Sequence, residues 1–335
     1  MIRKIGLSLV ISVVIFFVIA IGLVYSDQPA PATPEPGKGM AFESALAIDY
    51  SDLPESQTYK ARDGAALLFR RYDGSDGPER FIILVHGSAW HGMQFHAMAK
   101  QLASGSGTVI VPDMRGHGAK PARRGDIDYI SQLEDDIADL ITNLKRDRPG
   151  AQIVLGGHSS GGGFVLRFAG GDHGGQADAF ILLAPFLKYN APTTRENSGG
   201  WAQPAVRRII GLTMLNAVGV TAFNDLPVIS FAMPESVLKG PFGHTATLTY
   251  TYRMNTGFAP HADYEADLAT IKKPLLVVAG AEDESFYADR YEEVISAHNS
   301  TGTYHVLPGV NHLGVVTQEA ATSKIAAWLA ALPAR

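Results

Sequence analysis

A serine with a glycine two residues away on each side is the strongest chemical signal in the sequence. It lies in Gly157-His158-Ser159-Ser160-Gly161, between a run that predicts a strand and a run that predicts a helix. In that context the turn strains the serine backbone, and the glycines let strand and helix approach closely. A chance match is possible in a chain with 35 glycines, but strand, motif and helix agree. We therefore predict that the Ser159 hydroxyl is a nucleophile at a sheet edge.

A serine nucleophile needs a base to take its proton and an acid to orient that base. His312 follows residues 304–307 and Asp283 follows residues 275–279, two runs that predict strands. The chain order serine, aspartate, histidine is the order expected after such a turn. We predict Ser159, Asp283 and His312 as the catalytic residues. The glutamates on either side of Asp283 compete with it, because spacing alone does not separate adjacent acids.

Two backbone N–H groups are expected to stabilise a developing oxyanion. One belongs to Ser88, which follows a predicted strand at residues 81–85, and the other to Ser160, which follows the nucleophile. Trp90 and His158 are the expected substrate contacts.

The histidines do not form a metal-binding pattern. His86, His91 and His96 are five residues apart, a spacing that neither helix nor strand brings onto one face. His86 is expected to be a buried imidazole that hydrogen-bonds its own loop. Asp113 and Arg115 are expected to form an ion pair that fixes their loop. We expect no metal and no cofactor.

The elements that position these residues alternate between strands and helices. A hairpin with a turn at Asp63-Gly64 is predicted over residues 57–74. Further strands are predicted at residues 81–85, 108–111, 152–155, 179–183, 275–279 and 304–307. Helices are predicted at residues 93–103, 129–145, 164–169, 287–297 and 323–332. This alternation predicts an α/β fold with a mostly parallel central sheet and helices on both faces.

Residues 188–270 interrupt the alternation. The segment is too long for a bare connection and is rich in apolar and aromatic side chains. We predict an inserted, mainly helical cap between two parts of the core, residues 41–187 and 271–335. An apolar cap favours a substrate with an acyl chain or another apolar group.

The N-terminus predicts membrane attachment. The uncharged run 5–25 is long enough for a helix that crosses a bilayer. Arg3 and Lys4 precede it, so the positive-inside rule places the catalytic domain outside the cytoplasm, on the periplasmic or extracellular side. We predict a transmembrane anchor over residues 1–25, with a long signal peptide, cleaved or uncleaved, as the alternative. Residues 26–40 are Pro-rich and predict an extended linker.

Composition excludes several classes of protein. The chain has 335 residues, of which 46% are hydrophobic and 18% charged, so it is neither disordered nor collagen-like. The formal net charge of -5 gives no reason to expect nucleic-acid binding. The absence of cysteine excludes disulfides, zinc fingers, iron–sulfur clusters and a cysteine nucleophile. The sequence leaves the oligomeric state open.

The motifs resemble those of the α/β-hydrolase superfamily, and within it the monoacylglycerol lipase/lysophospholipase group, also described as serine aminopeptidase S33-like. The similar segments are LVHGSAWH (84–91), VPDMRGHG (111–118), GGHSSGG (156–162), ILLAPFLKY (181–189), VVAGAEDE (277–284) and PGVNH (308–312). The resemblance implies Ser159 as nucleophile, Asp283 as acid and His312 as base, with Ser88 and Ser160 as oxyanion donors. The pair Ala89-Trp90, the cap and the anchor depart from the group's pattern, which leaves the substrate open.

We expect a membrane-anchored serine hydrolase that cleaves carboxylic esters of an apolar, monoacylglycerol- or lysophospholipid-like substrate through an acyl-enzyme. Aminopeptidase, amidase, thioesterase and perhydrolase activities are alternatives on the same fold. An aminopeptidase needs an acid for the substrate ammonium, for which Glu196, Asp225 and Glu235 in the cap are candidates. A non-catalytic binding protein is the last alternative, and it would be favoured only by a missing triad residue.

Overall fold

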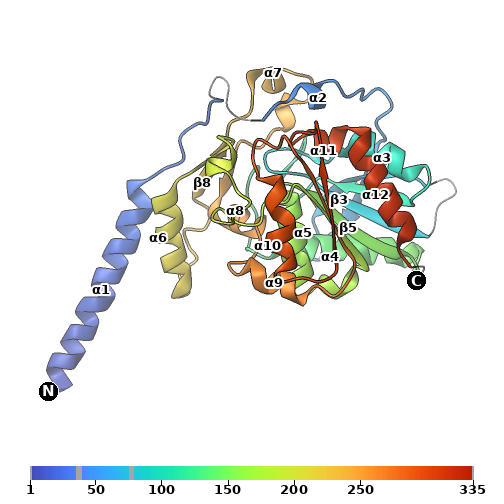
Figure 1. Ribbon diagram of the computed structural model, residues 1–335. Helices are drawn as coiled ribbons and strands as arrows, with labels where there is room; N and C mark the ends of the chain where they lie inside the picture. Colours follow the sequence, from blue (N-terminus) through green and yellow to red (C-terminus); the bar gives the residue numbers. More distant parts are fainter. Residues whose placement is uncertain (1, 35–39, 75–78, 334–335) are drawn as a thin grey trace.

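The core of the molecule is built around a central sheet of eight strands (Figure 1). The computed structural model describes residues 2–34, 40–74 and 79–333. The strand order is β1-β2-β4-β3-β5-β6-β10-β11, in which β1 and β2 are antiparallel to their neighbours and the others run parallel. The strands are β1 Ser56–Lys60, β2 Ala66–Tyr72, β3 Arg80–Val85, β4 Thr108–Pro112, β5 Gln152–His158, β6 Ala179–Leu183, β10 Leu275–Gly280 and β11 Gly302–Leu307.

The apolar runs of the sequence form the middle of this sheet. Strands β3, β4, β5, β6 and β10 are buried along their whole length. Strands covered on both faces have this continuous apolar pattern, and the predicted α/β fold is confirmed. The predicted hairpin is also confirmed, because β1 and β2 pair around a turn in which Gly64 has a φ of 89°.

Helices flank the sheet, and their ends differ from the sequence prediction. In Figure 1, α3, α11 and α12 lie together on one side, and α5 and α9 lie together on the other. Two predicted helices, at residues 93–103 and 287–297, each begin with a 3-10 turn. The helices and 3-10 turns of the core are α2 Glu43–Leu46, η1 Gly92–Phe95, α3 His96–Ala103, α4 Gln132–Asp147, α5 Ser160–Gly170, η2 Gly174–Gln176, α9 Tyr264–Thr270, η5 Ala288–Arg290, α10 Tyr291–Ser296, α11 Gly314–Thr317 and α12 Glu319–Ala331.

The segment between β6 and α9 carries helices and also a small sheet that the sequence did not predict. This sheet is antiparallel, in the order β7-β8-β9, and its strands are β7 Ala202–Pro204, β8 Pro227–Phe231 and β9 Thr249–Thr251. Strands of three to five residues, two of them containing proline, are too short to show an alternating pattern. The helical elements are η3 Glu196–Ser198, α6 Val206–Ala217, α7 Glu235–Leu238, η4 Gly243–Thr245 and α8 Tyr252–Gly257.

The N-terminal helix α1 (Ile2–Ser26) projects from the body of the molecule and packs against α6 (Figure 1). Its residues 8–26 are long and apolar enough to cross a membrane, a test that a signal sequence also passes. Ala20 and Val24 are fully buried in a cluster with Leu212 and Leu215 of α6. The predicted linker over residues 26–40 lies partly outside the described residues, because residues 35–39 are not described.

Candidate active site

Ser159 lies at the sharp turn between β5 and α5. Its φ of 56° and ψ of -120° are a strained conformation for a residue with a side chain. A side chain at Gly157 would collide with the carbonyl oxygen of Gly161, and one at Gly161 would collide with carbonyl oxygens at the end of β3. The Ser159 N–H donates to the Leu183 carbonyl at 2.9 Å, which fixes the turn to β6. The predicted strand–turn–helix context of Ser159 is therefore confirmed.

Asp283 and His312 lie side by side at the ends of β10 and β11. The Nδ1 atom of His312 is 2.8 Å from Oδ2 of Asp283, and the two residues are only 1% and 2% exposed. The other oxygen, Oδ1, accepts the N–H groups of Ser285 and Phe286, both at 2.8 Å. These two bonds fix the carboxylate. The carboxylate in turn holds the imidazole so that Nδ1 faces Asp283 and Nε2 faces away from it.

The neighbouring Glu284 has a different position. Its Oε1 accepts the N–H of Ala41 at 3.0 Å, and its Oε2 accepts the N–H of His312 at 2.9 Å. Glu284 thus contacts the backbone of the histidine loop, whereas Asp283 contacts the ring. Of the adjacent acids that spacing could not separate, Asp283 is the one hydrogen-bonded to the imidazole.

Ser159 and His312 line the same narrow cleft, together with Ser88 and Trp90. Among the described residues, no hydrogen bond joins the Ser159 hydroxyl to His312. Such bonds are often long in an unliganded enzyme and tighten when substrate binds. The structure thus brings the predicted nucleophile and base to one site.

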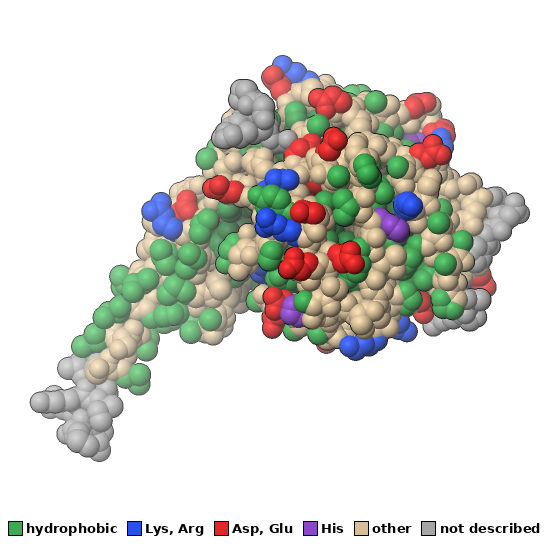
Figure 2. Space-filling model, in the orientation of Figure 1, with side chains coloured by type: hydrophobic (Ala, Val, Ile, Leu, Met, Phe, Trp, Pro, Cys, Tyr) green, Lys and Arg blue, Asp and Glu red, His purple; other side chains and the backbone are tan. Residues whose placement is uncertain are grey.

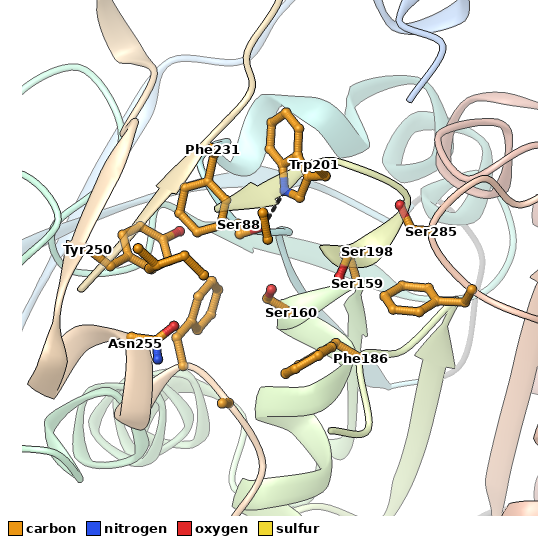
Figure 3. A pocket seen from close by; sticks show the side chains of 15 residues that line it. Ser88, Ser159, Ser160, Phe186, Ser198, Trp201, Phe231, Tyr250, Asn255 and Ser285 are labelled. Atoms are coloured by element: carbon orange, nitrogen blue, oxygen red, sulfur yellow. Dashed lines mark hydrogen bonds between the residues drawn. The ribbon is translucent and has the colours of Figure 1, made fainter. Parts of the chain in front are cut away.

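The predicted oxyanion donors lie next to Ser159 (Figure 3). Ser160 is the first residue of α5, so its N–H has no acceptor within the helix. The Ser88 N–H has no partner in the described parts of the chain. Helix α5 also directs the positive end of its dipole toward this point. The two N–H groups are therefore available to an oxyanion.

Two aromatic residues of the cap hold the loop that carries Ser88. Nε1 of Trp201 donates to the Ser88 hydroxyl at 3.0 Å, as the dashed line in Figure 3 marks. The next residue, Ala89, has a φ of 61°, and its N–H donates to the Tyr250 hydroxyl at 2.8 Å. The sequence did not indicate these contacts, because the short strands of the cap carry no recognisable motif.

The expected structural role of His86 is confirmed. Its Nδ1 donates to the Gly87 carbonyl at 2.8 Å, and its Nε2 accepts the Met114 N–H at 3.1 Å. Burial lowers the pKa of His86, so the ring is neutral, as this pattern of one donor and one acceptor requires.

His158, an expected substrate contact, lines the cleft but also supports the catalytic loop. Its Nε2 lies 3.1 Å from the carbonyl oxygen of His312, and its Nδ1 lies 3.3 Å from the Gln94 amide nitrogen. Burial, with a smaller contribution from His312, lowers the pKa of His158 well below its usual value. The neutral ring therefore donates to the His312 carbonyl and accepts from Gln94. Trp90, the other expected contact, also lines the cleft.

The predicted ion pair between Asp113 and Arg115 is wrong. Arg115 pairs with Asp136 of α4 at 2.7 Å and with Asp63 of the hairpin turn at 3.0 Å, while Asp113 accepts the Gly92 N–H at 2.8 Å. The chain turns at this point, and the two side chains contact different elements.

A second pocket, rich in aromatic side chains, adjoins Ser159 on the side of Ser160 (Figure 3). It encloses about 60 Å³. Its apolar walls include Phe186, Ile229, Phe231, Phe258 and Phe286. In the described parts of the chain, neither this pocket nor the cleft is lined by an aspartate or a glutamate.

The three acids considered as ammonium ligands therefore line neither cavity. Glu196, Asp225 and Glu235 are absent from the lining residues, and Glu235 pairs with Lys239 at 2.7 Å. The site as described has no carboxylate placed to bind a substrate ammonium group.

The chain is similar to known proteins in sequence and in fold. A family model described as "Serine aminopeptidase, S33" matches residues 76–316. Over 135 residues the chain is 27% identical to a monoacylglycerol lipase of Mycolicibacterium smegmatis, covering 40% of this chain and 48% of the relative. Over 144 residues it is 26% identical to human monoglyceride lipase, covering 43% and 46%. The matches thus span about half the length of these curated relatives.

Solved structures show the same fold at low sequence identity. A soluble variant of monoglyceride lipase from Saccharomyces cerevisiae aligns with a TM-score of 0.61 and 16% identity, covering 90% of this chain and 98% of that chain. An esterase from Thermogutta terrifontis aligns with a TM-score of 0.56 and 22% identity, covering 82% and 98%. With the family model matching most of the chain, the protein belongs to the serine aminopeptidase S33 family of α/β hydrolases.

Proposed function

We propose that this protein is a serine hydrolase that cleaves carboxylic ester bonds. The observation that carries the proposal is the buried hydrogen bond of 2.8 Å between Asp283 and His312, in a cleft that also contains the strained Ser159. A hydroxyl, an imidazole and a carboxylate in this relation form the machinery of acyl transfer.

In the proposed first step, the Ser159 oxygen attacks the ester carbonyl carbon while Nε2 of His312 takes the hydroxyl proton. Negative charge develops on the carbonyl oxygen, and the N–H groups of Ser88 and Ser160 donate to it. The carbon–oxygen bond to the alcohol then breaks, and His312 gives its proton to the leaving oxygen. The acyl group stays on Ser159.

In the second step, water attacks the acyl-enzyme, with His312 again acting as the base. The carboxylic acid leaves and the Ser159 hydroxyl is restored. Asp283 stays ionised throughout and stabilises the imidazolium that forms in each step. No cofactor enters this cycle.

A covalent probe tests this assignment. A fluorophosphonate is expected to label the wild-type protein but not the Ser159→Ala variant. Only the wild-type protein is expected to cleave p-nitrophenyl esters. Ser104→Ala changes an exposed serine outside the site and is the control, expected to match wild type. Labelling or ester cleavage that persists in Ser159→Ala would refute the assignment.

We also propose that the acyl group is apolar, as in a monoacylglycerol or a lysophospholipid. The aromatic walls next to Ser160 and the similarity to monoacylglycerol lipases support this substrate class. The absence of a lining carboxylate in the described residues disfavours the aminopeptidase alternative, although the family description carries that name. Ester panels that differ only in acyl length test the class, and a preference for acetyl over every longer chain would contradict it.

Helix α1 is proposed as a membrane anchor that keeps the catalytic domain outside the cytoplasm. Figure 2 shows apolar side chains along α1, and Val206 and Ile210 are exposed on α6, the helix that packs against α1. Such a surface suits the acyl region of a bilayer. Alkaline extraction of membranes and N-terminal sequencing of the product test this proposal, and a product that begins after residue 26 would show a cleaved signal instead.

A further inference from the structure

The chain just after the Pro-rich stretch reaches the catalytic centre. Met40 and Phe42 line the cleft that contains Ser159 and His312, although they lie more than 100 positions before Ser159 in the sequence. Phe42 is buried, while Glu43 and Leu46 in the following helix α2 are exposed. Ala45 of α2 is also buried, so the segment packs into the molecule at more than one residue, and Phe42 does so at the cleft.

Specific contacts hold this segment in place. The Ala41 N–H donates to Glu284, whose second oxygen accepts the N–H of His312. One carboxylate thus joins the segment to the loop of the expected base. The Phe42 ring lies 5.5 Å from the ring of Trp90 and 5.8 Å from that of Trp201, measured between ring centroids. These spacings are typical of favourable aromatic contacts.

The position of His312 indicates which part of an ester belongs in this cleft. His312 lines the cleft but not the aromatic pocket on the side of Ser160. The imidazole must give its proton to the leaving oxygen, so the alcohol part of the ester has to lie on the side of His312. The acyl part then points into the other pocket. Ser88 and Trp201 line both cavities and stand at their boundary.

We propose that Met40–Phe42 forms one wall of an alcohol-binding subsite, and that the Phe42 ring packs against the carbon chain of the alcohol. The inference rests on the proposed function and deepens it. Phe42, Trp90 and Trp201 line the cleft with apolar rings, and no acid or lysine lines it in the described residues.

Two esters of one acid test the subsite. Benzyl butanoate and methyl butanoate share their acyl group and differ only in the alcohol. For Phe42→Ala, the ratio of kcat/KM for benzyl over methyl ester is expected to fall about tenfold, because truncation removes the ring contacts that only benzyl makes. Phe42→Leu keeps apolar bulk and is expected to give an intermediate ratio. Leu46→Ala, an exposed change in the same segment, is the control and is expected to keep the wild-type ratio.

Equal losses with both esters would mean that Phe42 only supports the site, and equal gains would mean that it obstructs the site. Either result overturns the inference. Saturation-transfer NMR with benzyl alcohol tests the subsite without turnover, since binding is expected to weaken in Phe42→Ala. If fluorophosphonate fails to label the wild type while benzyl alcohol binding still depends on Phe42, the proposed function fails and the subsite stands.

Discussion

At the scale of residues, a substitution that breaks the hydrogen bond between Asp283 and His312 has the clearest expected effect on activity. Asp283→Asn presents an amide to Nδ1 and favours the wrong tautomer of the ring, so kcat for an ester is expected to fall by about 10³- to 10⁴-fold. Glu282→Gln alters an exposed neighbour and is the matched control. Steady-state kinetics with a p-nitrophenyl ester measures both, and an Asp283→Asn enzyme within tenfold of wild type would remove Asp283 from the mechanism.

The buried His91 is expected to make the free energy of unfolding depend on pH. Burial is the main cause that lowers the pKa of this histidine to about 3. The unfolded chain binds a proton at His91 below about pH 6.5, whereas the folded chain does not, so stability falls as pH falls from 6.5 toward 3. Between pH 7 and pH 5 this residue contributes a loss of about 2 kcal/mol in the free energy of unfolding.

Removing that titration is expected to flatten the pH dependence. His91→Phe keeps a flat ring beside Trp90, on which His91 stacks with a centroid distance of 5.6 Å. Urea unfolding of the two proteins at pH 7 and pH 5 measures the difference. The variant is expected to lose about 2 kcal/mol less than wild type over this interval, and equal losses would contradict the prediction.

Some residues of the site could be predicted from the sequence, and others could not. Ser159 and His312 could be predicted because each follows a predicted strand and lies in a short motif. Asp283 was also predicted, but spacing alone did not separate it from Glu284, and the structure shows that only the Asp283 carboxylate meets the ring. Phe42 and Trp201 could not be predicted, because they come from segments far away in the chain and have no local pattern.

At the scale of elements, the turn from β5 to α5 has no room for a side chain at Gly157. An added Cβ atom would overlap the Gly161 carbonyl oxygen, which belongs to backbone and cannot move aside. Gly157→Ala is expected to destabilise the protein by about 3 kcal/mol or more. Gly150→Ala places a methyl group in open space and is the control. Thermal unfolding distinguishes them, and similar melting temperatures would show that the turn adapts.

The buried strands and the amphipathic helix α4 were predictable because burial on one or two faces leaves a pattern in the sequence. The sheet β7-β8-β9 was not, since its three strands lie apart in the chain and are short. Their pairing depends on contacts between segments, which periodicity within one segment does not contain.

At the scale of the whole molecule, α1 is joined to the cap and not only to the end of the chain. The Arg208 guanidinium donates to the carbonyl oxygens of Val24 in α1 and Pro227 in β8, both at 2.9 Å. Gly211 lies against α1, and a side chain there would meet the Ala20 carbonyl oxygen at 2.6 Å and the Val24 side chain at 2.9 Å. Helix α1 and the segment between β6 and α9 are therefore one packed unit.

Separating the two helices is expected to expose the apolar cluster they share. Gly211→Leu pushes α1 from α6 and uncovers Leu212 and Leu215, so in detergent the variant is expected to self-associate more and to unfold at a temperature several degrees lower. Gly22→Leu adds the same side chain to a face of α1 with nothing within 4 Å, and is expected to behave as wild type. Light scattering and thermal unfolding measure both variants. If the two leucine variants behaved alike, α1 would be a tether that makes no stabilising contact with the cap.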